Sequence, residues 1–214
     1  KDGRTLLLMR HGATVTEAPW RFVGSRDIRL GEAGREQARS WSTVLAGLDL
    51  DAAWCSDLSR ARETARLALE ASSIEATELP GLRELTLGQW EGLQVEEVRE
   101  RFPGAHGARG ADLANYRPHG GESFADVAAR ALETLAFIRE SALRQGAGRV
   151  LAVAHAGFNR ALVCALLGVS LSKVFSLGQD HACLNVIRLE PGPPVLKALN
   201  LPPGTLPWPL SGRK

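Results

Sequence analysis

An arginine, a histidine and a glycine directly follow an apolar run near the start of the chain. The run is Leu6–Met9, and the three residues are Arg10, His11 and Gly12. An apolar run ended by a glycine turn predicts a buried strand, and ligands of open α/β sheets bind at such strand ends. Histidine can attack phosphorus, and arginine keeps its charge and can hold anionic oxygens with two parallel hydrogen bonds. The three residues therefore suit phosphate chemistry, although a lone arginine–histidine pair is more often an ordinary surface or core feature.

A second histidine occupies the same kind of position much later in the chain. Residues 148–154 form another buried-strand pattern, and His155, Ala156 and Gly157 follow it. Two apolar strands that each end in a histidine and a glycine turn are hard to explain by packing alone. The repetition favours a functional role for both histidines.

Two further segments complete a recognisable pattern. Ser56–Ala65 contains an Arg-Ala-Arg-Glu-Thr sequence, and Leu82–Gly92 contains Glu84. Together with the two histidine segments, and in this order, they resemble the histidine phosphatase superfamily, which also holds the cofactor-dependent phosphoglycerate mutases. The resemblance extends through residues 21–38 and Gly120–Ser123 and covers roughly residues 5–190. It is strongest to the phosphatase branch that includes α-ribazole phosphatases and sugar-phosphate phosphatases.

The resemblance implies a catalytic role for five residues. His11 would attack phosphorus with one ring nitrogen, while a backbone carbonyl holds the other, and a phosphohistidine would form. Arg10, Arg60 and His155 would surround the transferred group and stabilise its charge. Glu84 would protonate the leaving oxygen and then accept a proton from the attacking water. Further substrate-binding positions that the family pattern indicates are Arg10, Gly12, Thr14, Glu17, Arg21, Gly24, Arg60 and Ala156.

Two of these assignments have a nearby rival. Arg60 fits the arginine of the family's Arg-Ala-x-x-Thr pattern, and it would lie in the first turn of a helix, where free N–H groups attract anions. Arg62 would point roughly 200° away around that helix, so we interpret it as an ion-pairing residue. Glu91 is the rival of Glu84, but its Gln-Trp-Glu-Gly context indicates a turn or a helix start.

The chain departs from the family pattern at two positions. Glu17 stands where members often have a phosphate-binding asparagine, and Val23 replaces the hydroxyl residue that mutases have before Gly24. A carboxylate repels phosphate unless it is paired, for example with Arg21 or Arg10. Both changes remove polar phosphate contacts and disfavour the mutase reaction.

The preferred interpretation is a metal-independent phosphomonoesterase. A phosphoglycerate mutase is the alternative within the family, and a phosphate-binding protein without turnover is the alternative outside it. A metallohydrolase that uses His11, His155, His181 and Glu84 is less favoured, because no usual metal-ligand spacing occurs. We expect no cofactor and no bound metal, and a small phosphorylated metabolite as the partner.

Composition sets limits on other functions. The 214 residues are 44% hydrophobic and 23% charged, and the formal net charge is +2. Such a charge is too small to indicate binding to nucleic acid or a membrane surface, and no apolar stretch approaches the roughly 20 residues that span a bilayer. Cys55, Cys164 and Cys183 lack metal-type spacing, so we expect buried free thiols and a cytoplasmic location. A homodimer remains open.

Alternating patterns predict the fold. Strands are expected at residues 5–9, 52–55, 74–79, 149–154 and 183–189, with a weaker one at 195–199. Helices are expected at residues 32–46, 57–71, 122–145 and 158–167, the second capped by Ser56. This alternation favours a three-layer α/β/α sandwich around a mainly parallel sheet.

The remaining segments are expected to serve that sandwich. Residues 85–121 are rich in glycine and contain Pro103 and Pro118, which indicates a cap over the catalytic edge that sets substrate preference. We expect a single domain over residues 1–214, with an irregular tail over 200–214. Interior packing is the interpretation for Trp41, Trp54 and Trp90, and Trp20 could border the site. Loop positions are the interpretation for His106, His119 and His181.

Overall fold

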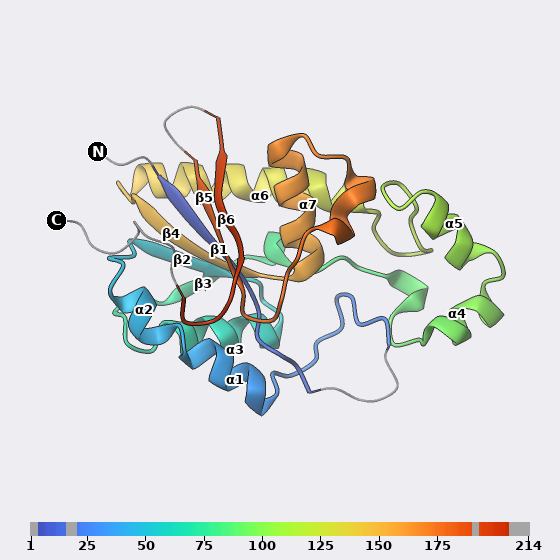
Figure 1. Cartoon of the computed structure of the whole chain (residues 1–214), viewed down its shortest axis with the longest axis horizontal. Helices are drawn as coiled ribbons and strands as arrows, with labels where there is room; N and C mark the ends of the chain where they lie inside the picture. The colour runs from blue at the N-terminus through green and yellow to red at the C-terminus, as the bar shows by residue number, and fades with distance from the viewer. Residues whose placement is uncertain (1–3, 16–20, 190–192, 206–214) are drawn as a thin grey trace.

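A six-stranded sheet forms the centre of the computed structural model, which describes residues 4–15, 21–189 and 193–205. The strands lie in the order β3-β2-β4-β1-β5-β6 (Figure 1). Their bounds are β1 Thr5–Arg10, β2 Ala52–Cys55, β3 Ala76–Glu78, β4 Arg149–Ala154, β5 Leu184–Arg188 and β6 Val195–Leu201. The first four strands pair in parallel, whereas β5 pairs antiparallel with both β1 and β6. The mainly parallel sheet that the sequence predicts is confirmed.

Helices cover both faces of this sheet (Figure 1). One face carries α1 (Glu32–Arg39), α2 (Ser42–Ala46) and α3 (Ser59–Ala68). The other carries α6 (Phe124–Arg144) and α7 (Ala156–Leu167). The three-layer sandwich is therefore confirmed.

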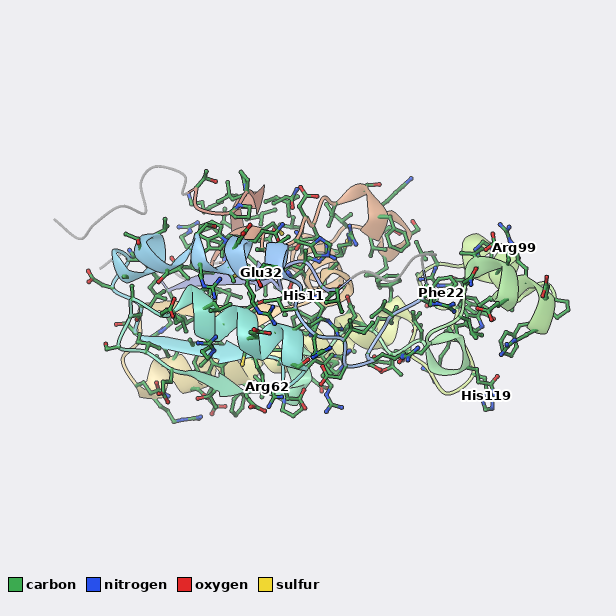
Figure 2. All side chains as sticks on the ribbon, turned by 90° about the horizontal axis from the view of Figure 1, so that it is seen from below. His11, Phe22, Glu32, Arg62, Arg99 and His119 are labelled. Carbon is green, nitrogen blue, oxygen red and sulfur yellow. The ribbon has the colours of Figure 1, made fainter. Side chains whose placement is uncertain are left out.

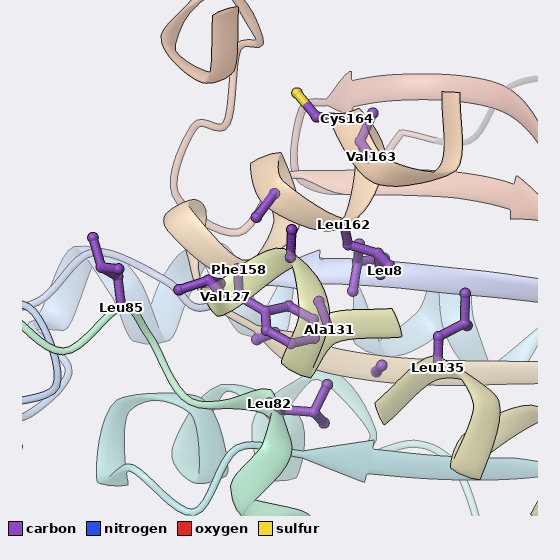
Figure 3. Packing of buried hydrophobic residues seen from close by; sticks show 14 of the residues in the cluster. Leu8, Leu82, Leu85, Val127, Ala131, Leu135, Phe158, Leu162, Val163 and Cys164 are labelled. Atoms are coloured by element: carbon purple, nitrogen blue, oxygen red, sulfur yellow. The ribbon is translucent and has the colours of Figure 1, made fainter. Parts of the chain in front are cut away.

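Strand β1 contributes to two hydrophobic cores, because successive side chains of a strand point to opposite faces of the sheet. In β1, Leu6 and Leu8 pack in the cluster that includes the buried residues of α6 and α7, and Figure 3 shows Leu8 within this cluster. Leu7 and Met9 pack in the cluster on the side of α2 and α3. All four residues are at most 1% exposed, so this apolar run forms a strand that is buried on both faces, as the sequence predicts.

The segment between η1 (Pro80–Leu82) and α6 projects beyond the sheet (Figure 1). It contains η2 (Gly88–Trp90) and two short helices, α4 (Val95–Arg101) and α5 (Ala105–Ala111). Trp90 is 2% exposed and packs between Phe22 and Tyr116, with ring centroids 5.5 and 5.7 Å away. Figure 2 shows Phe22, Arg99 and His119 at this end of the molecule. The aromatic side chains of this projecting segment therefore continue the hydrophobic core that lies on the α6 and α7 side of the sheet.

Two predicted helices begin or break differently in the structure. The helix expected over 32–46 is divided into α1 and α2 at Trp41, whose buried indole N–H donates to the carbonyl of Ala182 at 2.7 Å. The helix expected from residue 57 begins at Ser59, so the prediction that Ser56 caps it is wrong. Asp27 accepts the N–H of Ser59 instead, at 2.7 Å, and thereby satisfies a free donor of the first turn.

The other two helices also differ at their starts. Helix α6 begins at Phe124 because the Ser123 hydroxyl accepts the N–H of Asp126, and Asp126 accepts the N–H of Ser123 in return. Helix α7 begins at Ala156, two residues before the predicted start, with His155 as its N-cap. It ends at Gly168 in the left-handed conformation, as predicted.

The C-terminal part adds η3 (Leu171–Ser176) before β5. Strand β6 continues to Leu201, two residues into the segment expected to be irregular, and a turn follows at residues 202–205. Residues 206–214 lie outside the described part of the chain. In that described part, no helix is long and apolar enough to cross a membrane.

Candidate active site

Both predicted histidines lie at the same edge of the sheet. The parallel strands β1 and β4 end in register, with Arg10 opposite Ala154, so His11 and His155 follow at neighbouring strand ends. The N–H of His11 donates to the Ala154 carbonyl at 3.0 Å, and the two imidazole centroids are 5.1 Å apart. The side chains of His11 and His155 are 6% and 0% exposed. The structure thus brings the two strand-end histidines into one buried cluster.

The tautomer of His11 follows from its hydrogen bonds. Its Nδ1 lies 2.7 Å from the carbonyl oxygen of Gly12, which can only accept, so Nδ1 carries the proton. Its Nε2 accepts from Nε of Arg60 at 3.3 Å and therefore presents a lone pair. Gly12 allows this arrangement because a Cβ there would lie only 2.4 Å from the Gly34 carbonyl oxygen. His11 consequently offers one nucleophilic nitrogen in a fixed direction.

Two arginines that are held by backbone carbonyls flank this nitrogen. Arg60, 1% exposed, donates to the carbonyls of Arg26 and Gly24 at 2.6 and 2.9 Å. Arg10 donates to the Gln179 carbonyl at 2.5 Å and to Nε2 of His181 at 2.8 Å. Because no described carboxylate forms an ion pair with either guanidinium, their positive charges remain available to an anion.

Several buried polar atoms of the site lack a partner. Both ring nitrogens of His155 and Nε of Arg10 make no hydrogen bond within the part of the chain that the structure describes. A buried polar group without a partner is costly, and such groups are rare away from functional sites. Because the ring of His155 lies 5.1 Å from that of His11, an anionic ligand bound at His11 would supply acceptors for the N–H of His155 and for Nε of Arg10.

Glu84 reaches the same cluster from the loop after η1. Its carboxylate accepts the N–H groups of Gly157 and Phe158, at 3.1 and 3.2 Å, in the first turn of α7. A Cβ at Gly157 would lie 2.4 Å from that carboxylate, so the glycine makes this approach possible. The acid therefore lies next to the helix whose N-cap is His155.

Burial and positive charge keep the site histidines neutral. Burial holds the pKa of His11 well below its usual 6.5, and the charges of Arg60 and Arg10 lower it further. The pKa of His155 is also well below 6.5, because of burial and then of His11 and Arg60. At neutral pH, Nε2 of His11 is therefore unprotonated and able to attack an electrophile.

His181 is the site residue that sequence reasoning missed. Interpreted there as a loop histidine, it lies in the turn before β5, and its ring centroid is 5.9 Å from that of His11. Burial and then Arg10 lower its pKa from 6.5 to about 4, so it remains a neutral acceptor for Arg10. The sequence signal that could have identified His181 is its position just before β5. Because β5 is antiparallel to β1, the start of β5 lies at the same edge of the sheet as His11.

The remaining predicted binding residues have mixed surroundings. The Gly12 N–H donates to the Thr64 hydroxyl at 3.0 Å, and Gly24 binds Arg60 through its carbonyl. Thr14 forms an isolated bridge with Leu30. Arg21 donates to the Gly92 carbonyl and to Glu97, whereas the buried Ala156 opens α7 beside His155. Glu17 and Trp20 lie outside the described residues.

The rival residues have structural partners. Arg62 pairs with Glu78 at 3.4 Å, on the exposed surface. Glu91 accepts the N–H groups of Ser25 and Leu87, at 2.9 and 3.1 Å, and thereby fixes the loop whose Gly24 and Arg26 carbonyls hold Arg60. Interior packing is confirmed for the three predicted tryptophans, Trp41, Trp54 and Trp90, and burial for the free thiols of Cys55, Cys164 and Cys183.

The lowered pKa values predict how stability depends on pH. The unfolded chain takes up protons at these histidines near pH 6.5, whereas folded His181 takes one up only near pH 4. The free energy of unfolding should therefore fall as the pH drops below 6.5, by about 1.4 kcal/mol per pH unit for each such histidine. In His181→Asn, we expect the free energy of unfolding to change less steeply between pH 6 and pH 5, by about 1.4 kcal/mol per pH unit, which is the contribution of one bound proton. Urea unfolding in a buffer without phosphate measures it, and an unchanged slope would contradict a neutral His181.

The cluster has the properties of a phosphoryl-binding site. Among the described residues, no group of three or more histidine, cysteine or acidic side chains is placed to hold a metal ion. Instead, an unprotonated imidazole nitrogen, two guanidiniums and one carboxylate surround unpartnered buried donors. Fold and site together define an enzyme class that handles phosphoryl groups at the ends of parallel strands.

Comparison with known proteins narrows this class to a family. The model of the histidine phosphatase superfamily (branch 1) matches residues 6–202, and the chain belongs to this family. It is 34% identical over 203 residues to phosphoserine phosphatase 1 of Hydrogenobacter thermophilus, with 92% of each chain covered. It is 38% identical over 182 residues to the glucosyl-3-phosphoglycerate phosphatase of Mycolicibacterium vanbaalenii, with 82% of this chain and 79% of that protein covered.

A solved structure gives the same result. A putative α-ribazole-5'-P phosphatase from Escherichia coli superimposes with a TM-score of 0.83 and 28% identity, and covers 92% of this chain and 96% of its own. The resemblance drawn from the four sequence segments is thereby confirmed. The chain is an enzyme, a phosphatase of the histidine phosphatase family.

Proposed function

We propose that the protein hydrolyses small phosphomonoesters through a phosphohistidine on His11, with Glu84 as the proton donor and without a metal ion. The observation that carries this proposal is the fixed tautomer of His11. Its Nδ1–H is bound by the Gly12 carbonyl, and its Nε2 lone pair lies within the cluster of Arg10, Arg60 and His155. A nucleophile held in this way needs no proton transfer before it attacks.

The first half of the reaction transfers the phosphoryl group. Nε2 of His11 forms a bond to phosphorus as the bond from phosphorus to the ester oxygen breaks, and Glu84 gives its proton to that oxygen. Arg10, Arg60 and the unpartnered donors nearby stabilise the negative charge on the phosphoryl oxygens. A cationic cage of this kind supplies electrostatic stabilisation that a metal ion provides in other phosphatases.

The second half returns the enzyme to its starting state. Glu84, now a carboxylate, accepts a proton from a water molecule as that water attacks the phosphohistidine. The nitrogen–phosphorus bond breaks, inorganic phosphate leaves, and His11 regains its lone pair. One carboxylic acid therefore serves both steps, first as acid and then as base.

The substrate is a small phosphorylated metabolite. Three relatives are named as phosphatases of phosphoserine, glucosyl-3-phosphoglycerate and α-ribazole-5'-P, and each of these is a phosphomonoester of a small molecule. The projecting segment 85–121 extends from the loop that carries Glu84, so we assign it the choice among such esters. It would act as a cap within a single domain formed by residues 1–214.

Phosphate release from an aryl phosphate, measured from pH 5 to 8 in excess chelator, tests the proposal. We expect release that the chelator does not inhibit, together with an acid-labile and alkali-stable phosphoenzyme after rapid quenching. Inhibition by the chelator would contradict metal independence, and a phosphoenzyme that resists acid would contradict phosphohistidine. Transfer of the phosphoryl group to added phosphoglycerate faster than to water would favour the mutase alternative.

A further inference from the structure

Arg160 is a cation near the site that the proposed reaction does not use. It lies on α7, five residues after His155, and is half-buried. Its Nε donates to the Leu177 carbonyl at 2.9 Å, and its guanidinium carbon lies 5.6 Å from the ring centroid of Phe175. Within the described residues, its two terminal nitrogens have no acceptor and no carboxylate forms an ion pair with it. The guanidinium is thus held in place by its Nε and by the Phe175 ring, and its two terminal nitrogens, the fork of the side chain, are free to bind a ligand.

The ring that supports Arg160 is itself fixed by the cap. Phe175 on η3 packs edge-on against Phe124 at 5.7 Å, and Arg109 of α5 lies 6.0 and 5.9 Å from these two rings. Phe175 is nevertheless 57% exposed, which is unusual for a large ring held by three neighbours. Cation–π contacts of this kind stabilise the ring without covering it. Phe175 and Arg160 therefore form a fixed, open wall where the cap meets the sandwich.

This wall adjoins the reacting groups. Glu84 accepts the N–H of Gly157 at 3.1 Å, and Arg160 follows Gly157 by three residues on the same face of α7. The Leu177 carbonyl that holds Arg160 comes two residues before Gln179, whose carbonyl holds Arg10. In agreement with this placement, the charge of Arg160 lowers the pKa of Arg10, and the charge of Glu84 raises the pKa of Arg160. The charge of Asp180 also raises the pKa of Arg160, and Asp180 accepts the side-chain amide of Asn200 at 2.8 Å. Because Glu84 protonates the leaving oxygen in the proposed reaction, the leaving alcohol must lie on the side of the phosphate that is next to Glu84 and to the face of α7 that carries Arg160.

We propose that Arg160 binds a carboxylate carried by the leaving alcohol, so that the preferred substrates are phosphomonoesters of hydroxy acids. This inference rests on the proposed function, because it uses the direction in which the alcohol leaves. Two free terminal nitrogens of a guanidinium match the two oxygens of a carboxylate. A single negative charge suits the position better than a second phosphate dianion, because the negative charges of Glu84 and Asp180 already act on Arg160.

Matched ester pairs test the preference. 3-Phosphoglycerate and glycerol 3-phosphate differ only by a carboxylate in place of a hydroxymethyl group. We expect kcat/KM to favour 3-phosphoglycerate in the wild type, and Arg160→Gln to reduce that ratio about 10- to 100-fold through KM, as expected for a lost charge-assisted pair. Arg160→Lys should retain part of the ratio, because it keeps the charge but loses the fork.

A control separates the fork from a general change of charge. Arg66→Gln removes the same charge from the exposed surface of α3, which lies outside the cap and on the face of the sheet opposite α7 (Figure 1), and should leave the ratio unchanged. Phe175→Leu should lower the ratio by a smaller factor than Arg160→Gln, because it loosens Arg160 without removing it. Equal losses for both esters in Arg160→Gln would show a merely structural role and overturn the inference.

The inference can fail separately from the proposed function. If the wild type hydrolyses both esters with a ratio near one, the phosphatase mechanism stands and the carboxylate site is wrong. If the wild type hydrolyses neither ester, calorimetric binding of the two esters to the His11→Ala protein gives the ratio without turnover. Equal affinities for the two esters in that experiment would also overturn the carboxylate site.

Discussion

Replacement of His11 by alanine is expected to abolish phosphate release from every phosphomonoester, with a loss of roughly 10⁴-fold or more in kcat. Removal of the nucleophile from other enzymes that form covalent intermediates costs this much. The reason here is geometric, because Nε2 of His11 is the imidazole nitrogen whose direction is fixed by a bonded Nδ1–H and by Arg60. Stopped assays of phosphate release, with rapid quenching for the phosphoenzyme, measure the effect.

His119→Ala is the matched control for this variant. His119 is an exposed histidine at the cap end of the molecule (Figure 2), and its backbone carbonyl rather than its ring contacts Gln89. We expect it to keep the wild-type rate. Should the His11→Ala protein release phosphate at the wild-type rate while remaining folded, another nucleophile must act and the phosphohistidine step is wrong.

The sheet and the pair of histidines could be predicted from the sequence for a local reason. A strand that is buried on both faces has a continuous apolar sequence, such as Leu6–Met9, and both β1 and β4 show this pattern. Because parallel strands present their carboxyl ends at one edge, residues that follow such runs must meet there. The shared edge of His11 and His155 therefore follows from local patterns, whereas their position side by side depends on the pairing of β1 with β4.

The partners of Arg10 could not be predicted in that way. Gln179 and His181, which hold its guanidinium, come from a turn more than 160 residues later in the chain. That turn is anchored by buried amides, since Gln179 accepts from Asn159 at 3.0 Å and donates to Asn185 at 2.7 Å. No spacing rule connects these residues, because they meet only when the antiparallel strand β5 pairs with β1.

The predicted boundaries of two helices are wrong for a similar reason. The break at Trp41 depends on a hydrogen bond to Ala182, and the start of α3 depends on Asp27 rather than on the adjacent Ser56. Both partners are remote in sequence, so local propensity favoured the wrong residue. The capping pair of Ser123 and Asp126 lies within one turn, and such a pattern is readable in a sequence.

Replacement of Glu84 by glutamine is expected to have the second largest effect, and its size should depend on the leaving group. Glutamine cannot donate a carboxyl proton, and loss of general acid catalysis costs about 10²- to 10⁴-fold. An alkyl phosphate needs that proton because its alkoxide leaves poorly. A 2,4-dinitrophenyl phosphate does not need it, so its phosphoryl transfer to His11 should be nearly unaffected.

Comparison of the two esters therefore identifies the proton donor. In Glu84→Gln we expect slow turnover of the alkyl ester without accumulation of phosphoenzyme. With the dinitrophenyl ester we expect a burst of phenolate followed by slow hydrolysis, because the second step still lacks its base. Affinity for inorganic phosphate should change little, since the glutamine oxygen can still accept one of the N–H groups of Gly157 and Phe158. Equal slowing of the first step for both esters would show that Glu84 orders the start of α7 rather than donating the proton. Another acid would then have to protonate the oxygen of the departing alcohol.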